Sequence, residues 1–391
     1  MTSQPPSPAS PAASGRVVVA MSGGVDSSVA AWHLVREGRD VVGLFMRNGV
    51  SVEEAESAKK SCCSSVDARD ARMVAAHLGI AFQAVDLGGE FSEVIRYFIS
   101  EYQRGRTPNP CAVCNRDLKF DALLRFATEL GATSVATGHY ARMRRTPDGR
   151  PIVLRGVDRT KDQSYQLFSV AEENLARTEL PLGEWTKPQV RELADRAGLR
   201  TASKPDSQEI CFVPSNDYRN LLREHDAALH PGKLVDTAGR VLGDHPGTEW
   251  FTIGQRRGLG VAAGVPLFVV DLVPSTGTVV LGGREECESS WIELEELNLI
   301  GFDVPRGGAF RAACQVRYHH EPVPALVEVD GSRAHVTFDQ PVHAVAPGQG
   351  GALYALEADG DWGAGERLLG GGWIGARDTG TVSAAPRPSP E

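Results

Sequence analysis

In the first half of the chain, short apolar runs alternate with segments whose apolar positions recur at helical spacing. The runs are rich in β-branched residues and predict buried strands over Val17–Met21, Val41–Met46 and Ala81–Leu87. Helical spacing predicts helices over Ser27–Glu37, Asp67–Leu78, Glu90–Gln103 and Leu118–Leu130, and a further strand is expected at Ser134–Thr137. This alternation predicts a parallel sheet with helices on both faces. Ligands of such sheets bind at the carboxyl ends of the strands, so a site is expected after Met21, Met46 and Thr137.

The pattern changes in the second half of the chain. One more helix is expected over Lys187–Leu199, where a Lys-Pro pair suits a first helical turn. Beyond about Asp217 short β runs dominate, at Lys233–Leu242, Leu267–Asp271, Gly277–Leu281, Ala309–Arg317, Ala325–Val329 and Ala334–Phe338. Turn signals at this spacing favour a small antiparallel barrel. We expect an α/β domain over 16–217, a small central β-rich domain over 218–287 and a C-terminal antiparallel β-barrel over 288–375, with disordered tails at 1–15 and 376–391.

Composition narrows the class of protein. Of the 391 residues, 41% are hydrophobic and 23% are charged, as in ordinary globular proteins, and no apolar run approaches the roughly 20 residues that cross a bilayer. The first 14 residues lack the charges and the apolar core of a signal peptide, so a cytoplasmic protein without a membrane partner is expected. Seven cysteines, an odd count, then favour reduced thiols.

The stretch Ser22–Ser28, SGGVDSS, joins the first strand to the first helix. Its two glycines allow a sharp turn that approaches a ligand closely, and the N–H groups of the helix's first turn favour an anion. The stretch lacks the lysine and the glycine spacing of the common phosphate-binding loops. It resembles the PP-loop of ATP pyrophosphatases, which hold pyrophosphate in this loop and use its Asp through bound magnesium. The resemblance implies a site that splits ATP into AMP and pyrophosphate.

Two further stretches contain single cysteines in polar surroundings. In Thr107–Arg116, the Pro-Asn-Pro sequence indicates extended backbone with a helix beginning near Asn115. A Cys114 thiol at that helix start, near Arg106 and Lys119, would have a lowered pKa. A zinc half-site would need a second CxxC pair, and Cys62-Cys63 is adjacent instead. Cys211 follows a polar turn and precedes apolar positions, which by itself is typical of a structural cysteine.

Eight ordered motifs, taken together, resemble the bacterial tRNA-specific 2-thiouridylases. They are SGGVDSS, Gly43–Met46, TPNPxxxCNxxxKF at Thr107–Phe120, ATGHYAR at Ala136–Arg142, KDQSY at Lys161–Tyr165, Ile210–Phe212, GQRRGLG at Gly254–Gly260 and Pro347–Gln349. The resemblance covers roughly residues 16–375. It implies an enzyme with an α/β PP-loop domain of the adenine nucleotide α-hydrolase type, which is Rossmann-like.

The resemblance also implies a reaction. The family adenylates the O2 atom of uridine 34 in tRNAs for Lys, Glu and Gln, with ATP and Mg²⁺, and then replaces that oxygen with sulfur. Cys114 matches the family's nucleophile and Cys211 the cysteine that receives a persulfide from a donor, such as a cysteine desulfurase or a persulfide relay protein. A transient Cys114–Cys211 disulfide follows if Cys114 frees the sulfur by thiol–disulfide exchange. Direct attack of the persulfide on the base is the alternative, and the sequence does not separate the two routes.

The remaining site residues are also carried over from the family. ATP would be bound by Ala20, Met21, Ser22, Gly23, Gly24, Val25, Asp26, Ser27, Met46 and Gly138. The target base would meet Asn109, Pro110 and Cys111, and the tRNA would contact His139, Lys161, Asp162, Gln163, Arg317, Tyr318 and Gln349. No protein ligand of a metal is assigned.

One residue departs from the family pattern. Many members have Asp where this chain has Cys111, and a thiol cannot do acid–base work at a carboxylate's pKa. A neutral substitution is the simplest interpretation. The alternative is that Cys111, Cys114 and Cys211 ligate an iron–sulfur cluster.

Other residues receive structural interpretations. No catalytic role is expected for Cys62 or Cys63, and Cys287 and Cys314 are expected to be packing residues. His319-His320 is placed on a strand, whose neighbours point to opposite faces, and is therefore not expected to bind metal as a pair.

Charge gives mixed support for an RNA partner. The net charge is −9, but residues 142–162 hold seven basic side chains against three acidic ones, and residues 96–119 hold five against two. These two windows are candidate phosphate contacts or merely solvated surface. Two rival functions remain open: another PP-loop adenylating ligase, which would not need Cys114 or Cys211, and a tRNA-binding relative that has lost its chemistry.

Overall fold

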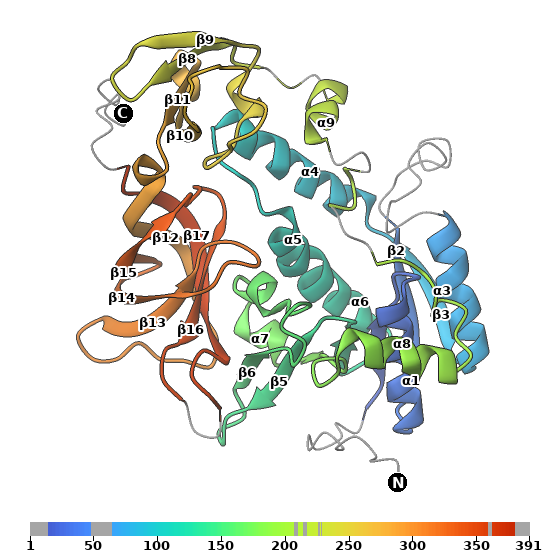
Figure 1. Ribbon diagram of the computed structural model, residues 1–391. Helices are drawn as coiled ribbons and strands as arrows, with labels where there is room; N and C mark the ends of the chain where they lie inside the picture. Colours follow the sequence, from blue (N-terminus) through green and yellow to red (C-terminus); the bar gives the residue numbers. More distant parts are fainter. Residues whose placement is uncertain are drawn as a thin grey trace.

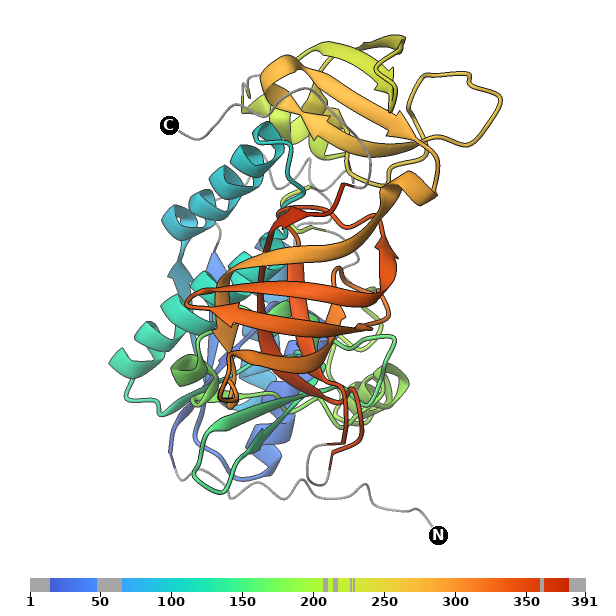
Figure 2. The ribbon, with the colours of Figure 1, turned by 90° about the vertical axis from the view of Figure 1, so that its left-hand side faces the viewer.

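The computed structural model describes residues 15–47, 65–206, 210–213, 217–225, 227, 229–358 and 362–379. These residues form an α/β domain, a small four-stranded β domain and an antiparallel barrel (Figure 1). Turned by 90°, the barrel lies in front of the α/β domain and the small β domain lies above both (Figure 2). The predicted fold class is confirmed.

The α/β domain is built on a five-stranded parallel sheet in the order β3-β2-β1-β4-β7. The strands are β1 (Val17–Ala20), β2 (Val41–Arg47), β3 (Ala81–Asp86), β4 (Ser134–Ala136) and β7 (Thr178–Glu179). The helical elements are α1 (Val25–Arg36), α3 (Ser65–Leu78), α4 (Gly88–Gln103), α5 (Pro110–Val113), η1 (Cys114–Ala122), α6 (Leu123–Glu129), η2 (Ser164–Leu167), α7 (Glu172–Leu175) and α8 (Lys187–Arg196).

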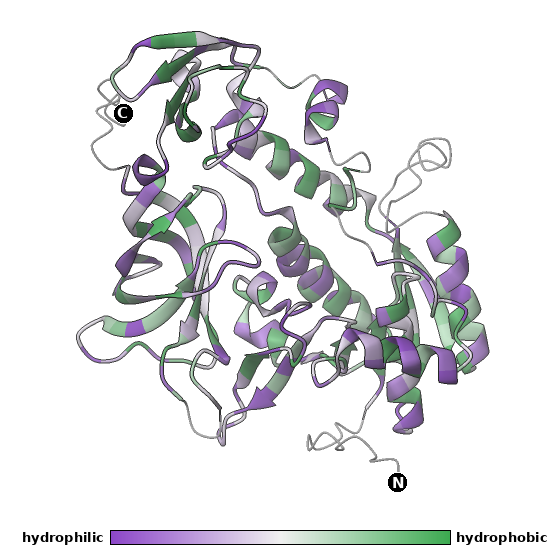
Figure 3. Cartoon of the chain, in the orientation of Figure 1, coloured by the Kyte–Doolittle hydropathy of each residue, from purple (hydrophilic) through white to green (hydrophobic). Residues whose placement is uncertain are grey.

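The alternation of side chains along β1 explains why both faces of the sheet are covered. Val17 and Val19 pack with apolar residues of α1, α3 and α8, whereas Val18 and Ala20 pack with Leu123 and other residues of α6. Successive side chains of a strand point to opposite faces, so an entirely apolar strand requires helices on both. The helices α3 and α4 show hydrophilic and hydrophobic residues side by side, as amphipathic helices should (Figure 3).

One helix boundary differs from the prediction. The helical segment begins at Pro110, the last residue of the Pro-Asn-Pro sequence, and not near Asn115. It runs through α5, η1 and α6. The prolines do not prevent this, because proline is tolerated in the first helical turn, where its missing N–H would have no partner. The side chain of Asn109 caps the helix by accepting a hydrogen bond from the Ala112 N–H at 3.2 Å. The middle portion, η1, is a π-helix.

The small β domain begins with α9 (Tyr218–Glu224) and has its own core. Its sheet order is β10-β11-β8-β9, formed by β8 (Gly232–Asp236), β9 (Val241–His245), β10 (Phe268–Val273) and β11 (Thr278–Gly282). Short 3₁₀ turns are η3 (Thr248–Trp250), η4 (Pro274–Thr276) and η5 (Glu285–Cys287). The buried residues include Leu234, Val269, Val279 and Leu281.

The C-terminal sheet closes into a six-stranded barrel because β12 pairs with both β15 and β17. Its strands are β12 (Glu288–Leu299), β13 (Ala309–Gln315), β14 (Val323–Asp330), β15 (Arg333–His343), β16 (Gly350–Ala355) and β17 (Arg367–Arg377). A hairpin of the α/β domain, β5 (Ala141–Arg145) and β6 (Pro151–Arg155), extends this sheet by pairing with β17. The barrel is therefore joined to the α/β domain by backbone hydrogen bonds.

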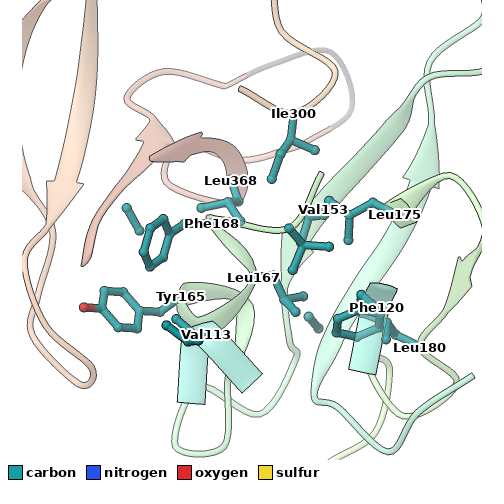
Figure 4. Packing of buried hydrophobic residues seen from close by; sticks show 14 of the residues in the cluster. Val113, Phe120, Val153, Tyr165, Leu167, Phe168, Leu175, Leu180, Ile300 and Leu368 are labelled. Atoms are coloured by element: carbon teal, nitrogen blue, oxygen red, sulfur yellow. The ribbon is translucent and has the colours of Figure 1, made fainter. Parts of the chain in front are cut away.

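A buried cluster of apolar residues fills the junction between these two domains. Val113, Phe120 and Tyr165 of the α/β domain meet Ile300 and Leu368 of the barrel in it (Figure 4). No helix among the described residues is long and apolar enough to cross a membrane.

Candidate functional site

The loop between β1 and α1 has the geometry of an anion site. The N-cap residue of α1, Gly24, has no side chain that bonds to the first turn, so the helix's first N–H groups remain available to a ligand. Gly23 has a φ of 72°, and a Cβ there would collide with the backbone of Asp67. A Cβ at Gly138 would lie 2.8 Å from the Ser27 nitrogen. Both positions therefore need glycine for the loop to pack this closely.

The other predicted ATP residues gather at the carboxyl edge of the sheet. Ala20 ends β1, Met46 lies one residue before the end of β2, and Gly138 follows β4. Met21 is 2% exposed, its side chain packs into the core and its N–H donates to the Leu44 carbonyl oxygen at 2.8 Å, so the Met21 side chain is not available to a ligand. This arrangement matches the predicted location at the strand ends.

Asp26 is the carboxylate of this loop, and it already has two polar partners. The Tyr140 hydroxyl donates to its Oδ1 at 2.7 Å, and the Lys187 Nζ lies 2.8 Å from both of its oxygens. Burial and the charge of Asp26 raise the pKa of Tyr140, so this phenol remains a donor. A single carboxylate beside a phosphate-binding turn fits Mg²⁺, which is held by one or two carboxylates together with substrate phosphates.

Lys187, which sequence reasoning treated only as a helix start, also reaches a second carboxylate. Its Nζ lies 3.0 Å from Asp206 Oδ1, and Asp206 is further bound by Lys161 at 2.9 Å and Arg191 at 2.5 Å. Burial alone would raise the pKa of Asp206, but hydrogen bonds from Lys161 and Lys187 outweigh it and lower the pKa to about 2. Nothing in the sequence signalled this cluster, because it joins side chains from separate segments of the chain.

Besides Lys187, Lys204 also contacts the loop between β1 and α1, which we name the nucleotide loop because it is predicted to bind ATP. Its Nζ lies 3.0 Å from the Gly23 carbonyl oxygen, 2.6 Å from Asp67 and 2.9 Å from Asp70. Lys204 and Asp206 belong to the same short segment, Lys204–Asp206, which we name the anchor segment. The anchor segment precedes Cys211 in the sequence and contacts the loop that is predicted to bind ATP.

Cys114 and Cys211 pack against the same buried cluster, which spans the α/β domain and the barrel. Phe212, next to Cys211, packs edge-on against Phe91 and Phe98 with ring centroids 5.7 Å and 5.3 Å apart. The expected position of Cys114 at a helix N-terminus is wrong, because the four residues of α5 precede it.

The basic side chains near Cys114 are engaged by carboxylates. Arg106 pairs with Glu101 at 2.7 Å, and Arg116 pairs with Asp117 at 2.7 Å. These carboxylates partly neutralise the guanidinium groups, so the two arginines stabilise a thiolate less than unpaired arginines would.

The residues predicted to touch the target base lie beside the barrel. Asn109 and Pro110 are buried and Cys111 is exposed. Burial, Asp162 and Cys111 together raise the pKa of Tyr318 to about 12. Within the described residues, no group of three or more His, Cys, Asp or Glu side chains is placed to hold a metal ion. Cys111, Cys114 and Cys211 therefore do not fit an iron–sulfur cluster in this arrangement.

Most of the predicted tRNA contacts have partners within the protein. Asp162 accepts hydrogen bonds from the Gly156 N–H, the Ser164 N–H and hydroxyl, and Arg155. Gln163 accepts from the Tyr140 N–H at 3.0 Å. Gln349 donates to the carbonyl oxygens of Thr107 at 3.1 Å and Pro108 at 2.8 Å. Arg317, in contrast, is exposed.

His139 is buried and lies 2.7 Å from the Thr137 hydroxyl through its Nδ1. Burial, with a smaller effect of Lys119, lowers its pKa well below the usual value. It is therefore a neutral imidazole at pH 7.

The positive charge of the two basic windows is largely used inside the fold. In the window 142–162, the ion pairs are Arg142–Glu366, Arg144–Glu184, Arg150–Glu172, Arg155–Asp162, Arg159–Glu366 and Lys161–Asp206. In the window 96–119, Arg96, Arg104, Arg106 and Arg116 also pair with carboxylates. These ion pairs offset much of the positive charge of both windows, and contact of the windows with phosphates stays a prediction.

The remaining predictions have mixed outcomes. Cys287 and Cys314 are fully buried, and burial raises their thiol pKa values to about 11 and about 12, as packing residues require. His319 and His320 are not on a strand; they lie in a turn after β13, where His319 has a φ of 60°. Cys62 and Cys63 lie outside the described residues.

Models of known families match three successive parts of the chain. Residues 15–215 match the tRNA methyl transferase HUP domain, and residues 219–283 match the tRNA methyl transferase PRC-barrel domain. Residues 289–374 match the aminomethyltransferase beta-barrel domain.

The chain is also similar over nearly its whole length to curated proteins called tRNA-specific 2-thiouridylase MnmA. It is 48% identical over 368 residues to the one from Carboxydothermus hydrogenoformans and 48% identical over 371 residues to the one from Geobacter metallireducens. Each match covers 93% of this chain and 98% of the relative. The relative from Rhodopirellula baltica is 42% identical over 392 residues, which covers 92% of this chain and 96% of the relative.

A solved structure with partial similarity is the U34-tRNA thiolase NcsA from Methanococcus maripaludis with its 4Fe–4S cluster. It is 18% identical with a TM-score of 0.32, over 54% of this chain and 66% of that chain. This likeness is too distant to support an argument.

Proposed function

The chain belongs to the tRNA-specific 2-thiouridylase family of sulfurtransferases, and from this premise we propose that it adenylates uridine 34 and then transfers sulfur from Cys211. Its tRNA-modifying function is that of the family, and its PP-loop domain belongs to an ATP-utilising class. The tRNAs for Lys, Glu and Gln are the proposed substrates. The observation that carries the proposal is the contact between the nucleotide loop and the anchor segment that leads to Cys211.

The first half-reaction is assigned to the loop of Ala20–Ser27. The O2 atom of uracil is a poor leaving group until it is adenylated, after which it departs with AMP. The uncapped N-terminus of α1 would hold the pyrophosphate portion of ATP, and Gly23 and Gly138 would allow close backbone approach. Mg²⁺ bound with ATP supplies positive charge against the departing pyrophosphate, and Asp26 is the residue that would hold it.

The second half-reaction is assigned to the two cysteines. A donor protein, such as a cysteine desulfurase or a persulfide relay protein, loads Cys211 with a persulfide. The Cys114 thiolate then attacks the Cys211 sulfur, forms a Cys114–Cys211 disulfide and expels hydrosulfide. Hydrosulfide attacks C2 of the adenylated uracil, the C2–O bond breaks and AMP leaves. The disulfide is restored to two thiols by an external thiol reductant, which supplies two electrons.

A second route differs only in the order of sulfur bonds. The outer sulfur of the Cys211 persulfide attacks C2 directly, AMP leaves, and Cys114 then cleaves the sulfur–sulfur bond to free the thiolated base. Both routes consume the same reductant and end in the same disulfide. Asn109–Cys111 on one side and Arg317 and Tyr318 on the other are the proposed contacts of the flipped base and its neighbours.

The test follows both halves in one reaction mixture. Unmodified tRNA, ATP, Mg²⁺, cysteine and a cysteine desulfurase are incubated with the protein, and pyrophosphate release and tRNA nucleosides are measured, the latter by mass spectrometry. Wild type should give pyrophosphate, AMP and 2-thiouridine. Cys211→Ser should release pyrophosphate but give no 2-thiouridine, and added sulfide should bypass the defect if hydrosulfide is the attacking species. Normal thiolation by Cys211→Ser from the enzymatic donor would exclude Cys211 as the sulfur carrier, whereas pyrophosphate release without 2-thiouridine in wild type would favour the rival ligase.

An Asp26→Ala variant tests the nucleotide half separately. It should lose pyrophosphate release in the presence of unmodified tRNA, by about 10²–10³-fold, the usual cost of removing one preorganised electrostatic contact. Undiminished pyrophosphate release by Asp26→Ala would contradict the assignment of this loop as a PP-loop. A protein that binds tRNA but releases no pyrophosphate in any form would be the non-catalytic relative.

A further inference from the structure

Lys187 joins two carboxylates that belong to the two halves of the proposed reaction. Its single ammonium lies 2.8 Å from both oxygens of Asp26, in the nucleotide loop, and 3.0 Å from Asp206, in the anchor segment. The Lys187 side chain is only 9% exposed, and those of Asp206 and Asp26 are 19% and 33% exposed. The bridge is therefore an electrostatic link between the nucleotide loop and the anchor segment that water screens only in part.

The position of Lys187 is unfavourable for its own helix. It is the first residue of α8, where the helix dipole disfavours a positive charge. The helix start is secured without it, because Gln189 Oε1 accepts hydrogen bonds from the N–H of Thr186 at 2.8 Å and from its hydroxyl at 3.0 Å. The ammonium is thus placed for its carboxylate partners and not for helix stability.

Holding Asp206 restricts where Cys211 can be. Five residues of extended chain span at most about 17 Å, so Cys211 cannot move farther than that from a fixed Asp206. On the other side of Cys211, Phe212 is held by Phe91 and Phe98. The chain is thus held by polar contacts before Cys211, at Asp206, and by apolar contacts after it, at Phe212. Only the polar contacts reach the nucleotide loop, through Lys187 and Lys204.

We propose that Lys187 is a positioning residue that couples occupancy of the nucleotide loop to the position of Cys211. One ammonium serves two carboxylates, so a cation-bearing nucleotide at Asp26 competes with Lys187 for that carboxylate. The Lys187 charge is then available to Asp206 alone, and the anchor segment is held more tightly when ATP is present. The inference rests on the proposed function, because it needs a nucleotide at Asp26 and a reactive Cys211.

Thiol alkylation without tRNA or a sulfur donor measures the coupling directly. The reduced protein is treated with N-ethylmaleimide with and without Mg²⁺ and α,β-methylene-ATP, which cannot be split between its α and β phosphates. The rate at Cys211 is read from its own peptide by mass spectrometry, and nucleotide binding is measured separately by calorimetry. In wild type the nucleotide should slow alkylation of Cys211 by about fivefold or more, the lower range of coupling between linked sites.

Three variants separate coupling from simple loosening. Asp206→Asn leaves Lys187 to Asp26 alone, so it should bind the nucleotide more weakly than wild type, and at a saturating nucleotide concentration Cys211 should no longer respond to it. Lys187→Met should also lose the response. Lys161→Met is the matched control: it removes another cation from Asp206 without touching Asp26, so it should raise the basal rate and keep the response.

The outcomes distinguish this inference from the proposed function. If wild type does not bind the nucleotide, the assignment of the ATP site fails. If wild type binds it but Cys211 alkylation is unchanged, or if Asp206→Asn keeps the full response, the coupling is wrong and the ATP site stands. If Lys161→Met loses the response as completely as Lys187→Met, the effect is general loosening of the anchor segment, which also overturns the coupling role.

Discussion

At the scale of single residues, several predicted ligand contacts also hold the fold together. The oxygens of Asp162 are occupied by four donors, and Gln163 binds a backbone N–H next to the nucleotide loop. A buried carboxylate with this many partners stabilises its surroundings and has little capacity left for RNA. Within the Lys-Asp-Gln motif, Lys161 could be released toward a phosphate only by giving up Asp206. A motif can therefore combine scaffold and ligand roles.

Cys111 offers a prediction about the departure from the family pattern. It is exposed, and no cluster of ligands includes it among the described residues. Cys111→Ser should therefore retain thiolation within about threefold of wild type, since substitutions of exposed side chains have small effects. The measurement is the rate of 2-thiouridine formation, and Cys114→Ser serves as the inactive comparison. A complete loss in Cys111→Ser, together with iron and labile sulfide in anaerobically purified wild type, would instead support a cluster.

His139 leads to a prediction about pH. Burial lowers its pKa, so the folded protein keeps it neutral while the unfolded chain takes up a proton below the ordinary pKa of about 6.5. The unfolded state then binds more protons, so this residue makes stability fall as pH drops below about 6.5, by up to about 1.4 kcal/mol per pH unit. His139→Gln should flatten the pH dependence of the unfolding free energy between pH 6.5 and 5.

Urea denaturation at several pH values makes this measurement, and His225→Gln is the matched control because His225 is exposed. An unchanged pH slope in His139→Gln would mean that the buried imidazole is not responsible.

At the scale of elements, the loop before α5, which leads to the proposed nucleophile Cys114, depends on the barrel for its shape. Gln349, just before β16, donates to the carbonyl oxygens of Thr107 and Pro108, and the Thr107 N–H donates to the Pro347 carbonyl oxygen at 2.7 Å. The loop that contains Asn109 and leads to Cys114 is thus fixed by a segment about 240 residues later in the sequence. The Pro-Gly-Gln motif therefore shapes the loop whether or not it touches RNA.

Replacing Gln349 tests this link. Gln349→Met removes both donors with little change of volume, and the loss of two hydrogen bonds at about 1 kcal/mol each should lower kcat/KM for tRNA by about tenfold or more. Nucleotide binding should be unchanged, because the hydrogen bonds that Gln349 donates go to Thr107, Pro108 and Ala346, far along the chain from the loop of Ala20–Ser27. Thiolation kinetics against tRNA concentration and calorimetry with α,β-methylene-ATP provide the two readouts. Weakened nucleotide binding would contradict the assignment.

The elements show what the sequence could and could not predict. The strands Val17–Ala20 and Val41–Arg47 and the helix α1 were predictable because their apolar period is local. The start at Pro110 was missed because two prolines were taken to exclude a helix, although a proline fits the first turn. The cluster of Asp26, Lys187 and Asp206 was beyond prediction, because ion pairs between distant segments leave no periodic signal.

At the scale of the whole molecule, the described residues contain separate hydrophobic cores, which tie the domains together to different degrees. One core is shared by the α/β domain and the barrel, since Phe168 packs edge-on against Trp373 of β17 at 5.0 Å, and the β5–β6 hairpin continues the barrel's sheet. The small β domain has its own core around Leu281 and Val269. The loop that leads to the proposed nucleophile Cys114 lies at the shared core, so its geometry depends on both large domains remaining joined.

A pair of core substitutions tests this division. Phe168→Ala removes a fully buried ring from the shared core and should cost about 3–5 kcal/mol, and Leu281→Ala should cost about 2–5 kcal/mol in the small β domain. Because the first core is common to both large domains, Phe168→Ala should speed hydrogen exchange together in β5, β6 and β17. Leu281→Ala should speed exchange in β8, β10 and β11 while leaving those strands protected. Exchange followed by mass spectrometry resolves these peptides, and faster exchange of β17 alone in Phe168→Ala would show that the barrel opens without the α/β domain.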